Sequence, residues 1–409
     1  MEVLKIATAG SVDDGKSTLI GRLLYDTQSL TSDKLEAIEK ASLKNGLNYL
    51  DFSLATDGLV AEREQGITID VAHIYFSTPK RSYIIADSPG HEEYTRNMIT
   101  GASTSTTSII LIDARKGVVG QTHRHFFINN LLRLKEIVVA VNKMDLVNYS
   151  EEVFNNIVTE FRELQAESSF KEQNIRFIPV SALWGENIAE RSSEMDWYTG
   201  PTVLEHLEGL QPEDTTALTQ ARFPVQTVIR PKTSSHHDFR GYAGKISGGS
   251  LKKGDAVTIL PSLTTSRIRE IYFHDEKYEE APAGSSVVIT LTDELNITRG
   301  DMIVRSEELP QEKRTLEAAL CWMDTKALTP GAKYLLQHNT CRVLVKIQGI
   351  GSAEDPDSRK QRQLNELGKV SIKLSRPLFV DTYESHKDNG RFILIDPQTN
   401  YTAGVGFIE

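Results

Sequence analysis

The sequence is poor in cysteine and contains no long hydrophobic run. Its 409 residues include two cysteines, Cys321 and Cys341. Two cysteines cannot form the disulfide framework of a small secreted domain, so free thiols in a reducing cytoplasm are expected. The N-terminal segment lacks the basic region, apolar run and cleavage site of a secretory signal. No stretch approaches the roughly 18–20 consecutive apolar residues of a membrane span. These absences favour a cytoplasmic protein that does not enter a membrane.

The sequence also lacks a basic domain. Its formal net charge is −10, with 46 Lys and Arg against 56 Asp and Glu. Residues 1–212 contain 20 basic and 30 acidic side chains, and residues 213–409 contain 26 of each. A DNA-binding domain normally presents a positively charged face. DNA is therefore not an expected partner, whereas a local RNA-binding patch remains compatible with these charges.

The first half of the chain alternates two kinds of pattern, which predicts an α/β fold. Apolar runs rich in Ile and Val occur at Val3–Ala9, Tyr83–Ala86, Ile109–Ile112, Ile137–Val141 and Phe177–Val180. Helical patterns lie between or after them, at Ser17–Tyr25, Glu92–Gly101, Thr122–Leu134 and Ser150–Glu167. Continuous apolar strands separated by helices indicate a mostly parallel sheet with helices on both faces.

Beyond Pro212 the helical periodicity largely disappears. Short β-branched segments recur there at Phe223–Arg230, Gly241–Ile246, Ala256–Pro261, Thr265–Tyr272 and Ser286–Leu291. Gly248-Gly249 and Lys252–Asp255 are predicted to form hairpin turns. We therefore predict three domains: an α/β P-loop domain at 1–212, a small β-barrel at 213–308 and a second small β-barrel at 309–409.

A phosphate-binding loop follows the first apolar run. Residues 10–17 match G-x-x-x-x-G-K-S between a predicted strand and a predicted helix, as this motif requires. Its glycines let backbone N–H groups surround phosphate oxygens, and the helix N-terminus favours negative charge. Lys16 is expected to reach the β- and γ-phosphates, and Ser17 to bind Mg²⁺. The predicted nucleotide-contacting residues here are Gly10, Ser11, Val12, Asp13, Asp14, Gly15, Lys16, Ser17 and Thr18.

Two later segments predict that the bound base is guanine. Asn142-Lys143-Met144-Asp145 ends the run Ile137–Val141. The Asp145 carboxylate can accept hydrogen bonds from N1–H and the 2-amino group of guanine, and adenine would leave that carboxylate unsatisfied. Asn142 is expected to fix the loop and touch N7, and the stem of Lys143 to lie over the base plane. A backbone contact to guanine O6 is expected from Ser181, Ala182 and Leu183.

A switch that senses the γ-phosphate is predicted from two more loops. Asp87 follows a predicted strand and is expected to hold Mg²⁺ through water, and the Gly90 N–H is expected to contact the γ-phosphate. Thr68 is expected to supply a second hydroxyl ligand for Mg²⁺. His91 is the candidate for orienting the attacking water, a part that Gln plays in other GTPases. Such loops are ordered by the γ-phosphate and released on hydrolysis. The predicted catalytic residues are His91, Lys16 and Thr68.

These motifs together resemble the translation-factor class of GTPases, which includes elongation factor Tu and eukaryotic elongation factor 1A. The architecture of that class is a GTPase domain followed by two β-barrels. A narrower resemblance, to the GTPase subunits (subunit 1, the large subunit) of bacterial sulfate adenylyltransferase, covers nearly the whole chain. The segments that carry it are 10–26, His91–Met98, Asp113–Val118, Trp197–Leu207, Arg222–Gly244, Pro330–Leu336, Leu374–Leu378 and Phe392–Asp396.

The narrower resemblance implies a function that the motifs alone do not specify. In that family the subunit uses GTP and Mg²⁺ and pairs with a small, ATP-pyrophosphatase-like catalytic subunit, as a heterodimer or a larger assembly. The partner forms adenosine 5′-phosphosulfate and pyrophosphate from ATP and sulfate, and GTP hydrolysis drives this uphill reaction. Some relatives carry a further adenylylsulfate kinase domain, which a single P-loop predicts to be absent from this chain.

Two alternatives stay open. The first is an elongation factor that delivers aminoacyl-tRNA to the ribosome, because the shared motifs report GTP chemistry rather than cargo. Ser11, where elongation factors usually have His, argues against it, as do Asp238–Gly244 and Trp197–Leu207. The second is a GTP-dependent binding module without catalysis, against which the intact Lys16, Thr68, Asp87 and His91 argue.

The sequence departs from the family pattern at several positions. Ser88 replaces a usual Thr, and Glu93 replaces a usual Gln. Ser88 keeps a small hydroxyl group, so catalysis is expected to survive. His236-His237 enlarges a loop, and we expect an exposed pair rather than a metal site because no third ligand is evident.

Overall fold

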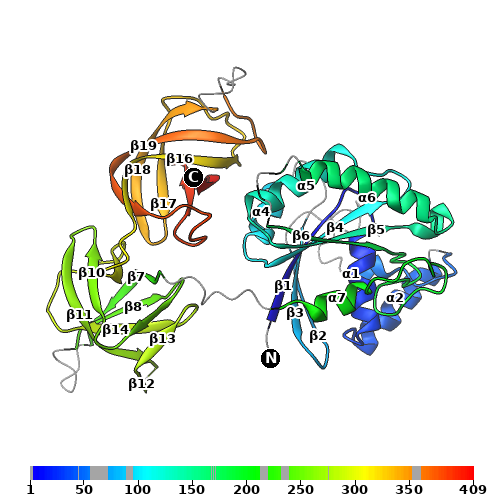
Figure 1. Cartoon of the computed structure of the whole chain (residues 1–409), viewed down its shortest axis with the longest axis horizontal. Coiled ribbons are helices and arrows are strands. Elements are labelled where there is room, and N and C mark those ends of the chain that lie inside the picture. Colours follow the sequence, from blue (N-terminus) through cyan, green and yellow to red (C-terminus); the bar gives the residue numbers. More distant parts are fainter. Residues whose placement is uncertain are drawn as a thin grey trace. The chain divides into compact units, whose positions relative to one another are not determined.

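The computed structural model describes residues 3–44, 46–55, 72–88, 95–166, 168, 170, 172–211, 220–231, 239–274, 276–351 and 361–409. Contacts divide the chain into two compact units, Met1–Glu213 and Asp214–Glu409 (Figure 1). Among the described residues, no helix is both long and apolar enough to span a membrane.

The first unit is built on a six-stranded sheet with the order β2-β3-β1-β4-β5-β6. The strands are β1 Val3–Ala9, β2 Ala72–Ser77, β3 Ser82–Asp87, β4 Thr107–Asp113, β5 Glu136–Asn142 and β6 Asn174–Pro179. Strand β2 pairs antiparallel to β3, and the other neighbours are parallel. Every residue of β4 is buried, as expected for a central strand covered on both faces.

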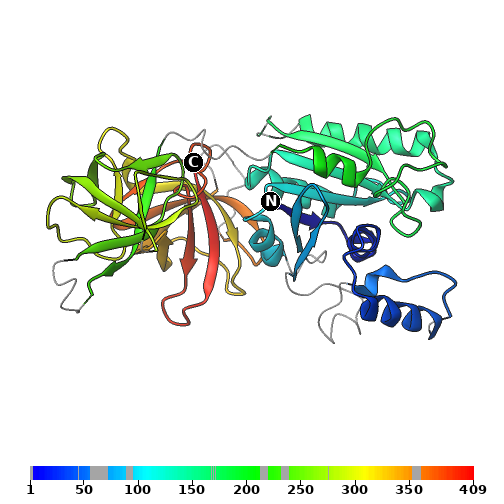
Figure 2. The same ribbon diagram turned by 90° about the horizontal axis from the view of Figure 1, so that it is seen from below.

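Helices cover both faces of this sheet. They are α1 Lys16–Asp26, α4 Thr95–Ala102, α5 Gly120–Leu131, α6 Glu151–Ala166 and α7 Val203–Gly209. Helix α2, Ser32–Lys44, lies apart from the sheet and contacts the short helix Phe52–Ala55. Figure 1 shows α5 and α6 on one face and α1 and α7 on the other, and Figure 2 shows the same layers from below. The apolar stripe Leu19, Ile20 and Leu23 turns α1 toward the sheet, where it shares a core with Leu207 of α7. Phe161 of α6 contacts Phe126 of α5 edge-on. This arrangement confirms the predicted α/β fold with helices on both faces.

The second unit contains two β structures. The first has the order β10-β15-β7-β8-β14-β11-β12, and an additional pairing of β10 with β11 brings the sheet round on itself. Its strands, with the separate pair β9 and β13, are β7 Arg222–Ile229, β8 Gly241–Lys245, β9 Ser250–Lys252, β10 Ala256–Leu260, β11 Thr264–Phe273, β12 Glu276–Tyr278, β13 Glu280–Pro282, β14 Ser286–Leu291 and β15 Met302–Arg305. The predicted β-rich character of this region is confirmed.

The second β structure is a closed barrel with the order β16-β19-β18-β17-β20-β21. Its strands are β16 Gln311–Trp322, β17 Lys333–His338, β18 Cys341–Ile350, β19 Leu367–Val380, β20 Arg391–Ile395 and β21 Thr402–Ile408. Strand β16 pairs with both β19 and β21, which closes the ring. Closure leaves no free sheet edge.

The prediction of two hairpins, at Gly248-Gly249 and Lys252–Asp255, is wrong. Chain reversals do occur near Gly248 and Gly254, but the strands on either side of each turn do not pair with each other. Strand β9, between the two turns, pairs with β13, while β8 pairs with β7 and β14. The glycines therefore mark changes of chain direction, and the adjoining strands pair with other partners.

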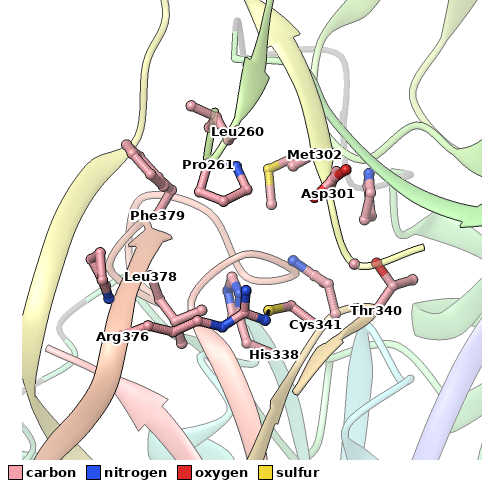
Figure 3. A pocket seen from close by; sticks show the side chains of 14 residues that line it. Leu260, Pro261, Asp301, Met302, His338, Thr340, Cys341, Arg376, Leu378 and Phe379 are labelled. Atoms are coloured by element: carbon pink, nitrogen blue, oxygen red, sulfur yellow. Dashed lines mark hydrogen bonds between the residues drawn. The ribbon is translucent and has the colours of Figure 1, made fainter. Parts of the chain in front are cut away.

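A buried ion pair joins the two β structures. Arg222 at the start of β7 donates two hydrogen bonds to Asp381, at 2.8 and 3.0 Å, and the Arg222 side chain is 1% exposed. Asn389 donates to the same carboxylate at 2.8 Å. Nearby, Met302 and Pro261 face Cys341 and Arg376 across a hollow (Figure 3). None of the predicted nucleotide-site residues lines this hollow.

Candidate nucleotide site

The loop between β1 and α1 has the backbone shape of a phosphate-binding loop. Asp13 and Gly15 both have positive φ, at 67° and 95°. A Cβ atom at Gly15 would lie 2.5 Å from Nδ2 of Asn142, so glycine is required there for both reasons. The Asp14 side chain accepts the N–H of Ser11 at 2.7 Å, and the Asp14 N–H donates to the Ser11 carbonyl at 3.2 Å. The loop is thereby held by its own side chain.

Lys16 carries a buried positive charge at the start of α1. The residue is 8% exposed, and Nζ donates to the Gly10 carbonyl at 3.4 Å. Burial lowers its pKa, although the nearby charges of Asp87 and Asp14 oppose that shift. A buried cation beside a helix N-terminus attracts an anion, because the unpaired N–H groups and the helix dipole favour negative charge. The arrangement is suited to phosphate.

Asp87 lies at the end of β3, directly beside β1. The parallel register places it opposite Thr8, whose hydroxyl donates to the Asp87 carboxylate at 3.0 Å. Ser17, in the first turn of α1, is half-buried. The described residues contain no group of three His, Cys, Asp or Glu side chains able to hold a metal. One carboxylate and a hydroxyl, completed by phosphate oxygens and water, are instead the ligand set that Mg²⁺ uses at nucleotides.

Two serine hydroxyls in this region have no hydrogen-bond partner among the described residues. They are Oγ of Ser11, in the phosphate loop, and Oγ of Ser88, immediately after Asp87. A buried hydroxyl without a partner costs about 1–3 kcal/mol. Such groups are explained when the missing partner is a ligand.

The predicted guanine-contacting loops meet each other and the phosphate loop. Asn142 donates from Nδ2 to the Asp14 carbonyl at 2.8 Å and accepts the N–H of Ala182 at 2.9 Å. The Ser181 hydroxyl donates to Oδ1 of Asp145 at 2.6 Å. Asn142 thus joins the phosphate loop, 128 residues before it, to the loop at Ala182, 40 residues after it. Ser181 orients the carboxylate predicted to read the base. Leu183 is half-buried beside them.

Lys143 has an unusual backbone conformation and a side chain whose ammonium group is bonded within the protein. Its backbone has a left-handed conformation with φ of 63°. Its ammonium group donates to the Asp13 carbonyl and lies 3.1 Å from Oδ2 of Asp113. Asp113 also accepts three hydrogen bonds from Arg115, from N and Nε at 3.0 Å and from Nη2 at 2.6 Å. Burial would raise the pKa of Asp113, but the bonds from Arg115 and the charge of Lys143 hold the pKa well below its usual range.

Three predicted site residues lie outside the described part of the chain: Thr68, Gly90 and His91. Their assignments stay predictions. His236-His237 and the variant position Glu93 also lie outside it.

Sequence reasoning missed three residues that support the site. Thr8 bonds to Asp87, Asp113 pairs with Lys143, and Lys116 lies 3.6 Å from Asp14. The segment containing Asp113 and Lys116 was singled out only for its resemblance. Their position in the sequence could have identified two of them. Thr8 and Asp113 both lie near the carboxyl ends of predicted strands, where ligands of open α/β sheets bind.

Comparisons with known proteins cover the whole chain. Residues 1–221 match the family model described as elongation factor Tu GTP binding domain, and residues 315–409 match the one described as GTP-eEF1A C-terminal domain-like. A sulfate adenylyltransferase subunit 1 from Cellvibrio japonicus is 45% identical over 414 residues, covering 100% of this chain and 86% of the relative. Another from Colwellia psychrerythraea is 46% identical over 415 residues, covering 100% and 88%. A protein from Mycobacterium tuberculosis named bifunctional enzyme CysN/CysC is 45% identical over 413 residues, covering 99% and 67%.

Proposed function

Because the chain belongs to the sulfate adenylyltransferase subunit 1 family, we propose that it is the regulatory GTPase subunit of a sulfate adenylyltransferase. Its GTP hydrolysis drives a partner subunit to form adenosine 5′-phosphosulfate and pyrophosphate from ATP and sulfate. The observation that carries this proposal is an identity of 45–46%, over all of the given chain, to relatives with that name. The assembled phosphate and guanine loops support it.

Each site residue has a role in this proposal. Backbone N–H groups of the phosphate loop and the Lys16 ammonium bind the β- and γ-phosphates, and Asp145 and Asn142 select guanine. Ser17, Thr68 and Asp87 hold Mg²⁺, which when bound neutralises charge that develops on the phosphates. His91 orients the attacking water, and the Gly90 N–H donates to the γ-phosphate. Thr8 keeps the Asp87 carboxylate oriented toward the loop through its 3.0 Å hydrogen bond.

The partner in this proposal is a small, ATP-pyrophosphatase-like catalytic subunit, in a cytoplasmic heterodimer or larger assembly. The single GTP site fits this division, because the ATP and sulfate sites then lie on the partner. For hydrolysis to drive the partner, the GTP and GDP states must make different contacts with it. We propose that the chain does this with three domains, a GTPase domain at 1–212 and two β-barrels at 213–308 and 309–409.

The proposal is tested by measuring GTP hydrolysis by the purified chain alone and with the small subunit, ATP and sulfate. We expect hydrolysis to rise with the complete mixture and adenosine 5′-phosphosulfate to accumulate only when GTP is present. The matched control is Lys16→Ala, which should abolish both signals because it removes the phosphate-binding cation. Hydrolysis that ignores the partner and sulfate but rises with ribosomes would instead place the chain among elongation factors that deliver aminoacyl-tRNA.

A further inference from the structure

A buried carboxylate stands behind the lysine of the guanine site. Asp113 is the last residue of β4, and the parallel register places it opposite Asn142, the residue before Lys143. Its side chain is fully buried, whereas those of Arg115 and Lys143 are 46% and 23% exposed. The carboxylate is therefore the inner member of the cluster, and the two cations approach it from the solvent side.

The ammonium of Lys143 has two fixed acceptors, on different parts of the chain. One is the Asp13 carbonyl in the phosphate loop, and the other is Oδ2 of Asp113 at 3.1 Å. The side chain therefore spans from the end of β5 to the phosphate loop. It passes over Gly15, where a Cβ atom would lie 4.0 Å from Cε of Lys143. Contacts within the protein therefore fix the position of the end of the Lys143 side chain.

Such anchoring matters because a lysine stem is flexible. Ordering its rotatable bonds when the base binds would reduce affinity, whereas a stem that is already ordered avoids that loss. Arg115 supplies three of the hydrogen bonds to Asp113, so the carboxylate stays ionised and in place while it holds Lys143.

We infer that Asp113 is a positioning residue for guanine nucleotides: its buried carboxylate fixes the Lys143 stem as the surface on which the base lies. The inference rests on the GTP binding in the proposed function. Asp113 acts on the surface that the flat face of the base contacts. It therefore affects the affinity for purine nucleotides in general. Recognition of the 2-amino group, at the edge of the base, belongs to Asp145.

The test compares Asp113→Asn, Lys143→Met and the double variant in the full-length chain, without partner subunit. Affinity for GDP is measured by displacement of a fluorescent GDP, and thermal unfolding is recorded for each protein. We expect Asp113→Asn to weaken GDP binding about tenfold, which corresponds to about 1.4 kcal/mol. The double variant should bind no more weakly than Lys143→Met, because both changes remove the same anchoring. The affinity of Asp113→Asn for inosine diphosphate should fall by the same factor as its affinity for GDP.

The control is Asp388→Asn, which breaks an exposed Asp–Arg pair in the second unit and should leave GDP affinity unchanged. GDP affinity of Asp113→Asn within twofold of the parent, or additive losses in the double variant, would overturn the inference. Should Asp113→Asn fail to fold, Lys143→Met decides alone: it keeps an apolar stem but loses the ammonium, and unchanged affinity would show that anchoring has no effect. A parent chain that binds no GDP would refute the proposed function instead.

Discussion

Two buried aspartates, one in each unit, are held by arginine in different ways. Asp113 is bonded by Arg115, two residues away, and by Lys143, both of which reach solvent. Asp381 is bonded by Arg222, 159 residues away, and by Asn389, with both Arg222 and Asp381 side chains at most 9% exposed. The first cluster contains the lysine that we propose lies under the base, and the second joins two β structures. The cations of the first cluster are open to solvent and can therefore contact a ligand, whereas the buried cation of the second contacts only protein groups.

The largest effect is expected when the second cluster, the Arg222–Asp381 pair, is broken. Arg222→Ala should lower the free energy of unfolding of the second unit by about 3–5 kcal/mol, because Asp381 is left as a buried, uncompensated charge. Urea unfolding followed by circular dichroism measures this. Arg391→Ala, which breaks a half-exposed pair with Asp388 in the closed barrel, should cost under about 1 kcal/mol. Equal losses of unfolding free energy in the two variants would show that the buried pair contributes no more than the half-exposed one.

His91→Ala should leave both clusters intact and remove catalysis. GTP turnover is expected to fall about 10²–10⁴-fold, the usual contribution of a positioned acid–base or water-orienting side chain. Binding of a fluorescent GTP analogue should stay within about threefold of the parent. His123→Ala, an exposed histidine on α5, is the matched control. Unchanged turnover in His91→Ala would refute the assignment of His91.

Asp145→Asn should change which base the first unit prefers, without affecting the barrels. The amide pairs poorly with guanine N1–H and the 2-amino group but well with the 2-oxo group of xanthine. We expect GTP affinity to fall by about 1–3 kcal/mol and xanthosine triphosphate affinity to rise. Competition binding with both nucleotides measures the ratio, with the exposed Asp196→Asn as control. Retained GTP affinity with no gain for xanthosine triphosphate would exclude base reading by Asp145.

The smallest expected effect is on the pH dependence of stability. Burial would raise the pKa of Asp381, but the bonds and charge of Arg222 outweigh it, so the folded-state pKa lies below its usual value of about 3.9. The stabilisation is therefore fully present above that unfolded-state value and is lost as pH falls through the lowered folded-state pKa. Urea midpoints between pH 7 and pH 3 should fall less steeply in the double variant Arg222→Met, Asp381→Leu. Parallel plots of urea midpoint against pH for the parent and the double variant would contradict the lowered pKa of Asp381.

The sequence predicted five strands of the first unit's sheet, including the edge strand β6, but missed the other edge strand, β2. Apolar runs that match β1, β3, β4, β5 and β6 are visible in the sequence because Ile and Val residues follow one another in them. Strand β2 is an edge strand with mostly exposed or half-buried residues, and α2 buries Ile38 and Ser42. Neither segment has an apolar pattern strong enough to distinguish it from a loop.

The phosphate loop, the segment Asn142–Asp145 and the alternation of strands and helices followed from the sequence alone, because each depends on residues close together in the chain. Tertiary structure decided what lies far apart. The parallel register of β4 and β5 brings Asp113 to Lys143, 30 positions away, and the contact between barrels brings Arg222 to Asp381. It also decided that β9 pairs with β13 rather than with β8. A local motif specifies the conformation of its own backbone. The partner of a buried charge or of an edge strand is determined only when segments distant in the sequence pack together.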